Sequence, residues 1–105
     1  MVLLDKGFKI PKSNAIAALD YNKISFPLTL RQWREGDWFI PFGMEGRKKI
    51  SDFLIDQKVP LHRKDSVLVL ESNGHIIWVV GHRIDNRYRI SEESEKVLLV
   101  RVMEG

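Results

Sequence analysis

Short segments in which hydrophobic and polar residues alternate occur along much of the chain, a pattern typical of half-buried β-strands. The most regular alternation covers residues 24–30. The apolar side chains that it places on one face are Ile24, Phe26, Leu28 and Leu30. Because Pro27 cannot donate a backbone hydrogen bond, we expect this strand at a sheet edge or at a bulge.

A second signal is the dipeptide Asn73-Gly74 between the apolar segments 67–71 and 76–80. Both residues accept positive φ angles, so the pair predicts a tight β-hairpin. Further short strands are predicted at residues 38–40, 88–90 and 97–102, and turns at residues 35–37 and 85–86. Residues 91–94 fit a turn or a single helical turn.

Residues 47–58 are the best helix candidate, and Pro60 would end the helix. At about 100° per residue the spacing places Ile50, Phe53, Leu54 and Gln57 on one arc. The opposite arc carries Lys48, Lys49, Asp52 and Asp56. Ile55 lies off the apolar arc, so its side chain is either exposed or in contact with a second surface.

Two segments leave alternatives open. Residues 14–20 fit a strand or a helical turn, and residues 1–12 fit a tail, a linker or an edge strand. One main helix and five to seven short strands predict an α+β domain with a mixed or antiparallel sheet. The length of 105 residues suits a single domain, residues 1–105.

Composition narrows the class of protein further. Hydrophobic residues at 44% and charged residues at 30% are ordinary for a globular domain. No apolar run approaches the roughly 18–20 residues of a membrane span, so no membrane contact is expected. The chain has no cysteine, which removes disulfides and thiolate-bound metals and favours a cytoplasmic location.

Positive charge is concentrated in one part of the chain. Residues 46–64 hold six Lys and Arg against two Asp, whereas the whole chain has a net charge of +3. The excess of positive charge therefore lies in this stretch. It is either a solvated basic face or a surface for a polyanion.

The sequence offers few groups for catalysis. Its histidines are scattered along the chain: His62, His75 and His82. No phosphate loop, nucleophile elbow or zinc-binding helix motif is present. Asp52 and Asp56 could bind a divalent metal, but ion pairs with Lys48 and Lys49 are the preferred interpretation. We therefore expect no metal, no cofactor and no self-contained active site in this domain.

The segment 43–49 combines two glycines with three cations. If the helix begins near Arg47, then Arg47, Lys48 and Lys49 crowd the positive end of its dipole, at about 0.3–1 kcal/mol each. Cations at this end lower the stability of the helix, so their presence indicates a function. The arrangement favours a phosphate site built from the free backbone amides of the helix start and the basic side chains. The alternative is that the glycines make a turn and the basic side chains extend into water.

Further basic residues follow the predicted helix and surround the turn at residues 85–86. They are Lys58, His62, Arg63 and Lys64, and then Arg83, Arg87 and Arg89. The first group would continue a phosphate-binding surface. For the second group, ion pairs of Arg83 or Arg87 with Asp85 are the alternative. We expect Trp38 and Trp78 in the core.

One ordered combination of residues is more specific than any single motif. It runs Arg31-x-Trp33-x-x-Gly36-Asp37-x-Phe39-x-Pro41-x-Gly43-Met44-x-Gly46-x-Lys48-Lys49-x-Ser51-Asp52-Phe53, then Lys58-Val59-Pro60, then Ile77-Trp78-Val79-x-Gly81-x-Arg83-Ile84-Asp85-x-Arg87-Tyr88. From about Ala15 to Val102 the chain closely resembles the C-terminal domain of bacterial tRNA(Ile)-lysidine synthetase.

The resemblance implies a role in tRNA modification. That family uses ATP, with magnesium, to adenylate the wobble cytidine of an isoleucine tRNA and then joins lysine to it. The chemistry belongs to an N-terminal ATP-pyrophosphatase domain with a Ser-Gly-Gly-x-Asp-Ser loop, which is absent from this sequence. The family's C-terminal domain contacts the tRNA acceptor stem and resembles a domain of the phenylalanyl-tRNA synthetase β chain. The implied partners are tRNA(Ile) and the N-terminal catalytic domain, and a homodimer stays open.

The family pattern also indicates which residues would contact RNA. The expected set is Arg47, Lys48, Lys49, Lys58, Arg63, Lys64, Arg83 and Arg87. Glu45 departs from the pattern, because a neutral or basic residue is expected there, and it weakens the predicted anion site. One alternative is an interaction module that docks on its own catalytic domain or a dimer partner. The other is a stand-alone enzyme with an unrecognised site.

Overall fold

The computed structural model describes residues 2–5 and 13–102 and confirms the α+β class. The strands are β1 Val2–Asp5, β2 Ile16–Asp20, β3 Leu28–Gln32, β4 Trp38–Phe39, β5 Lys48–Lys49, β6 Leu68–Ser72, β7 His75–Val79, β8 Arg83–Ile84 and β9 Lys96–Arg101. The helices are α1 Ile50–Asp56 and α2 Leu61–Lys64, with 3-10 turns η1 Tyr21–Lys23 and η2 Asn86–Tyr88.

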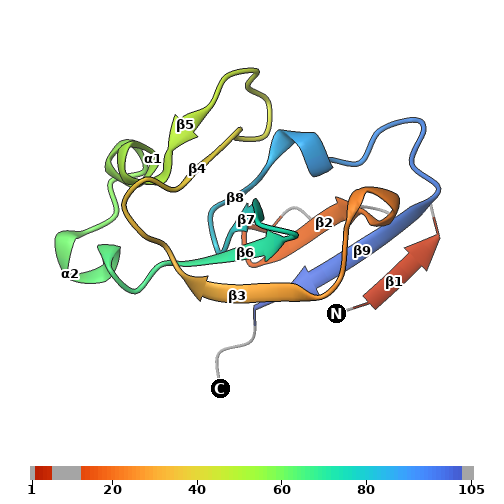
Figure 1. Cartoon of the computed structure of the whole chain (residues 1–105), viewed down its shortest axis with the longest axis horizontal. Helices are drawn as coiled ribbons and strands as arrows, with labels where there is room; N and C mark the ends of the chain where they lie inside the picture. Colours follow the sequence, from red (N-terminus) through yellow and green to blue (C-terminus); the bar gives the residue numbers. More distant parts are fainter. Residues whose placement is uncertain (1, 6–12, 103–105) are drawn as a thin grey trace.

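The strands form three small antiparallel sheets (Figure 1). One has the order β1-β9-β2, the second β3-β6-β7-β8, and the third is the pair β4-β5. The predicted hairpin is confirmed as β6 and β7, with φ of 50° at Asn73 and 81° at Gly74. Of the two alternatives for residues 14–20, a strand or a helical turn, the structure has a strand, β2. Strand β1 pairs with β9. Residues 6–12 lie outside the described residues.

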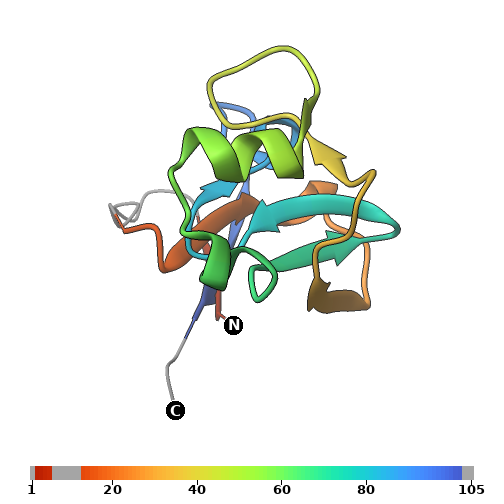
Figure 2. The ribbon, with the colours of Figure 1, turned by 90° about the vertical axis from the view of Figure 1, so that its left-hand side faces the viewer.

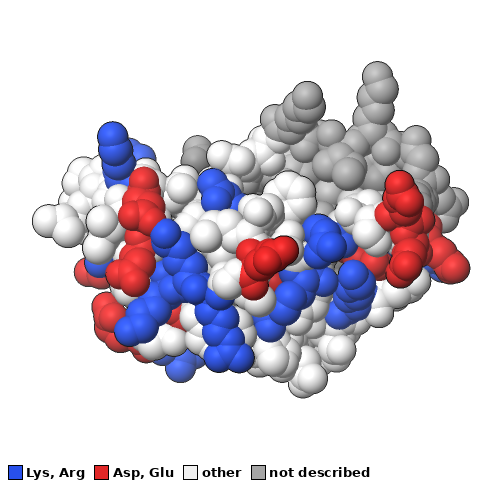
Figure 3. Space-filling model, turned by 90° about the horizontal axis from the view of Figure 1, so that it is seen from above, with Lys and Arg blue, Asp and Glu red and all other residues white. Residues whose placement is uncertain are grey.

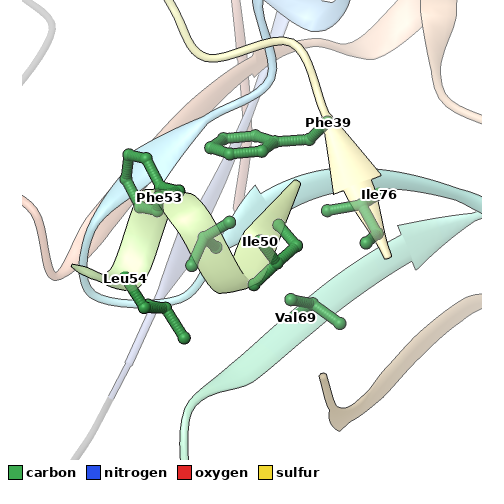
Figure 4. Packing of buried hydrophobic residues seen from close by; sticks show 7 residues of the cluster. Phe39, Ile50, Phe53, Leu54, Val69 and Ile76 are labelled. Carbon is green, nitrogen blue, oxygen red and sulfur yellow. The ribbon is translucent and has the colours of Figure 1, made fainter. Parts of the chain in front are cut away.

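The first core lies between α1 and the four-stranded sheet (Figure 2). As the predicted apolar arc requires, Ile50, Phe53 and Leu54 are buried against residues of β6 and β7 (Figure 4). The Phe39 ring meets the Phe53 ring edge to face at 4.9 Å between centroids. The arc is narrower than predicted, because Gln57 is exposed, and Ile55 is exposed as well.

The second core lies between the two larger sheets. Leu19 of β2 and Leu98 of β9 pack in one cluster with Leu70, Ile77 and Trp78. The four-stranded sheet therefore forms the middle layer, with α1 on one face and the β1-β9-β2 sheet on the other. Trp78 is core, as predicted.

Two strand predictions need correction. β3 lies at a sheet edge, as Pro27 predicts, but it begins at Leu28 and not at residue 24. Of the four residues predicted on one buried face, Ile24 and Leu28 pack against the second core, whereas Phe26 and Leu30 are 48% and 59% exposed. The predicted strand at residues 88–90 is replaced by η2, because the Asp85 carboxylate caps the turn by accepting from the Arg87 amide at 2.8 Å.

Candidate nucleic-acid interface

The predicted helix start at Arg47 is wrong. Lys48 and Lys49 form strand β5, where they pair with Phe39 and Trp38, and α1 begins at Ile50. The backbone of Lys49 is extended, with φ of −65° and ψ of 139°. Lys49 is the N-cap of α1, and Arg47 and Lys48 precede it, so none of the three cations lies in the first helical turn, as the prediction of a phosphate site at the helix start required.

Two of the eight predicted RNA-binding residues are held by carboxylates. Lys48 forms an ion pair with Asp56, and Arg87 forms one with Asp85, which was the alternative considered for that arginine. The other six make no ion pair with a carboxylate in residues 13–102: Arg47, Lys49, Lys58, Arg63, Lys64 and Arg83. These six keep their charge available for an external anion.

Trp38 brings two of the predicted cations together. The guanidinium carbons of Arg47 and Arg87 lie 4.0 and 4.9 Å from its ring centroid. Cations at this distance from an indole are attracted to its π electrons. Trp38 is only half-buried, so the expectation of a core tryptophan is wrong, and its ring supports two guanidinium groups. We call Trp38, Arg47 and Arg87 the Trp38 cluster.

Asp85 fixes the position of Arg87 from inside the fold. Its fully buried carboxylate accepts from Arg87 Nε at 3.0 Å and Nη2 at 2.9 Å, and from the Ile40 amide at 2.9 Å. The hydrogen bond to Asp85 outweighs burial and raises the pKa of Arg87 above its usual value. The guanidinium is thus held in one orientation and stays charged.

The loop that carries Arg47 is attached to the segment that carries Arg87. The Phe42 amide donates to Ile84 O at 3.0 Å, and the Gly43 amide donates to Asn86 Oδ1 at 3.1 Å. Gly43 has a φ of +89°, a conformation that glycine adopts without strain. Two segments about forty residues apart in sequence therefore form one surface.

Two open cavities have His82 in their linings. The first, the β8 cavity, has a volume of about 490 Å³ and is lined by residues that include Phe42, Trp78, Arg83 and Arg89. The second, the α2 cavity, has about 510 Å³ and is lined by residues that include Lys58, Pro60, Arg63 and Val67. Both share Gln57 and His82. The fold therefore brings Lys58, Arg63 and Arg83, far apart in sequence, to adjoining hollows.

The chain matches a family model described as TilS substrate C-terminal domain over residues 28–101. It is 56% identical over 93 residues to tRNA(Ile)-lysidine synthase of Parabacteroides distasonis, covering 89% of this chain and 21% of the relative. It is 41% identical over 96 residues to the enzyme of that name from Bacteroides thetaiotaomicron, covering 91% and 22%. The chain thus spans about a fifth of these curated relatives.

This chain belongs to the TilS C-terminal domain family. The fold agrees with a crystal structure of a TilS C-terminal domain, at a TM-score of 0.79 and 24% identity, covering 94% of this chain and 77% of that one. A TM-score of 0.64 relates it to an N-terminal fragment of the phenylalanyl-tRNA synthetase β-subunit of Pyrococcus horikoshii. That match is 16% identical and covers 80% of this chain and 26% of the fragment.

Besides Lys48, which is paired with Asp56, two predicted cations of this TilS domain lie outside the cluster and the cavities. The Lys64 ammonium is 5.5 Å from the Trp33 ring centroid, and Trp33 Nε1 donates to Lys64 O at 2.7 Å. Lys49 is exposed on β5, opposite Trp38 in the register. Seen from the side of α1 and β5, Lys and Arg side chains form a band across the surface that acidic groups interrupt (Figure 3).

Sequence reasoning missed two residues of the β8 cavity. Arg89 stands beside the predicted 85–86 turn and is not in the predicted RNA-binding set, although it lines the cavity together with Arg83. Phe42 gave no signal, because a single apolar residue in a glycine-containing loop has no periodicity. Its ring is 52% exposed.

Arg31 shows that some basic residues of the family pattern are structural. Its guanidinium donates to both carboxylate oxygens of Asp37, at 2.8 and 3.0 Å, and to Glu71 at 3.1 Å. Burial is the largest single effect and raises the pKa of Asp37, but the hydrogen bonds from Arg31 and the Arg34 amide, together with the attraction of both guanidinium groups, lower the net pKa below its usual value. Arg31 therefore joins β3, β6 and the turn before β4.

No group of three or more His, Asp or Glu side chains that could hold a metal ion converges among the described residues. Asp56, one of the two aspartates considered as a metal pair, is bound to Lys48. In the same part of the chain, no helix has the length and apolar character needed to cross a membrane.

Proposed function

We propose that this domain binds the acceptor stem of tRNA(Ile) and positions the tRNA for lysine transfer. The observation that carries the proposal is the set of six cations without a described carboxylate partner, several of which line adjoining cavities. Lys and Arg contacts to phosphates supply affinity and register but little sequence selection. An A-form stem presents mainly phosphates and ribose hydroxyls, so the domain recognises shape.

The chemistry in this proposal takes place outside the described residues. ATP and magnesium act in a catalytic domain of the same polypeptide, where lysine is joined to the wobble cytidine. The relatives named tRNA(Ile)-lysidine synthase support this arrangement, since each is about five times as long as the region that this chain covers. The partners are then tRNA(Ile) and that catalytic domain, in the cytoplasm.

A salt titration tests the proposal. The chain is mixed with a fluorescently labelled tRNA(Ile) transcript, and the dissociation constant is measured by anisotropy from low to physiological salt. If six cations each displace a counterion, the slope of log K against log salt is about −5, on the scale measured for duplex DNA. Binding that does not depend on salt, or no binding at the lowest salt, contradicts the proposal.

A docking module is the second candidate, and one observation favours it. Ile55 on α1 and Leu61 on α2 are 62% and 86% exposed, although both are large and apolar. In this alternative, the two side chains contribute to a contact surface for the catalytic domain or a second copy of this chain. Replacing both with serine then weakens assembly, measured by sedimentation, and leaves RNA affinity unchanged.

A further inference from the structure

The β8 cavity has an apolar interior that phosphate contacts to a double helix do not require. Its volume of about 490 Å³ falls within the range of about 300–1,000 Å³ typical of sites for small organic ligands. Trp78 and Ala18 contribute to its lining and are only 2% and 8% exposed. Ile84 and Ile90, both half-buried, add further apolar surface.

The same cavity is positively charged. Arg83 and Arg89 line it, and no Asp or Glu does so among the described residues. Arg89 Nη1 donates to Asn86 O at 2.7 Å, and the Arg83 guanidinium lies 5.4 Å from the Phe53 ring centroid. Both cations are therefore positioned by the fold, and neither forms an ion pair with a described carboxylate. The rim of the cavity suits a phosphate group.

An exposed aromatic ring completes the arrangement. Phe42 lines the cavity, and its backbone amide is tied to Ile84 O at 3.0 Å. The loop is therefore fixed while the ring remains 52% exposed. Aromatic rings beside a cationic groove are the combination that binds single-stranded nucleic acid, because every base can stack on a ring whatever its sequence.

We propose that the β8 cavity binds one unpaired nucleotide, with its base against Phe42 and its phosphate at Arg83 and Arg89. This inference rests on the proposed RNA-binding function and names a ligand for one part of that surface. A base inside a duplex is paired and stacked, so it cannot present its face to Phe42. The α2 cavity, beyond His82, offers Lys58 and Arg63 to the next phosphate along the strand.

The test compares RNA hairpins that share one stem. One hairpin is blunt, one carries four unpaired nucleotides at its 3′ end, and one carries them at its 5′ end. We expect an unpaired extension to tighten binding to the unchanged chain about tenfold, as base–aromatic stacking does elsewhere. Phe42→Ala removes this gain but binds the blunt hairpin as before, and Arg89→Gln reduces the gain.

Two matched variants serve as controls. Ile55→Ala shortens an exposed apolar side chain that lines neither cavity, and Lys96→Gln removes an exposed cation on β9. Both keep the tenfold gain. In addition, 4-thiouridine in the extension cross-links to residues 42–43 or 82–90. Equal affinity for blunt and extended hairpins overturns the nucleotide site and leaves the proposed function standing. No binding of any hairpin at low salt overturns both.

Discussion

At the scale of single residues, Asp85 is the buried group that organises the candidate interface. Its carboxylate accepts hydrogen bonds from Arg87 and from the Ile40 amide, and it is fully buried. We expect Asp85→Ala to lower the free energy of unfolding by about 3 kcal/mol, since it leaves the Arg87 guanidinium and the amides of Ile40 and Arg87 without their acceptor. Urea denaturation measures this as a lower midpoint at an unchanged m-value.

The control for Asp85 is Glu93→Gln, an exposed acidic residue whose side chain has no hydrogen bond to a described residue. Such a surface change stays within about 0.5 kcal/mol of the unchanged chain. If both variants unfold at the same urea concentration, the buried carboxylate does not hold the loop and the Arg87 segment together.

His82 gives a second prediction at this scale. Burial lowers the pKa of folded His82 below its usual value of 6.5. As the pH falls below 6.5, the unfolded chain binds the proton first, so the folded state loses stability down to the folded pKa. We expect the urea midpoint to fall between pH 7.5 and pH 5.5, and His82→Gln to flatten this dependence. His75→Gln, at the exposed first residue of β7, is the control and keeps it.

At the scale of secondary-structure elements, the sequence predicts what depends on near neighbours. The hairpin follows from the φ angles that Asn73 and Gly74 accept, and the buried face of α1 follows from helical spacing. The start of α1 does not follow from local sequence, because residues 48–49 pair with β4, about ten residues earlier. A pairing of this kind between strands competes with local helix propensity, and the spacing of hydrophobic residues along the chain does not reveal it.

The candidate site was predictable in its charges but not in its shape. The cations are evident from composition and from the family resemblance. The cavities are not, since their walls combine residues near 16, 42, 58 and 84 that meet only in the folded chain. Charge alone also could not distinguish Lys48, which is paired with Asp56, from Lys49, which is exposed next to it.

The end of α1 supplies a prediction that separates stability from binding. Lys58 has a φ of +57°, and its amide and the Val59 amide donate to Ile55 O and Leu54 O at the helix end. Glycine is usual at such a position, and another residue costs about 1 kcal/mol. We expect Lys58→Gly to raise the free energy of unfolding by about 0.5–1 kcal/mol and to weaken RNA binding.

Lys58→Ala is the matched variant, because it removes the same charge but keeps a side chain in the left-handed conformation. It weakens RNA binding equally and does not stabilise the domain. A stabilising effect of both variants in urea denaturation means that the lysine charge, not its backbone conformation, is unfavourable in the folded state.

At the scale of the whole molecule, the position of a charge should matter more than its number. We expect the double variant Lys58→Gln/Arg63→Gln to weaken tRNA binding and to reduce the magnitude of the log–log salt slope by nearly 2, because both residues line the α2 cavity. The control Lys23→Gln/Lys96→Gln changes the net charge equally. Both of its residues are exposed and line neither cavity, so the slope stays unchanged.

The comparison of these two variants separates a built interface from a general attraction between a basic protein and RNA. Long-range attraction depends on net charge and falls off within a Debye length of about 10 Å at 0.1 M salt. A contact that releases counterions depends on which side chains reach the phosphates. Equal losses in the two variants therefore indicate attraction through net charge, whereas a loss confined to Lys58 and Arg63 places the RNA backbone along the α2 cavity.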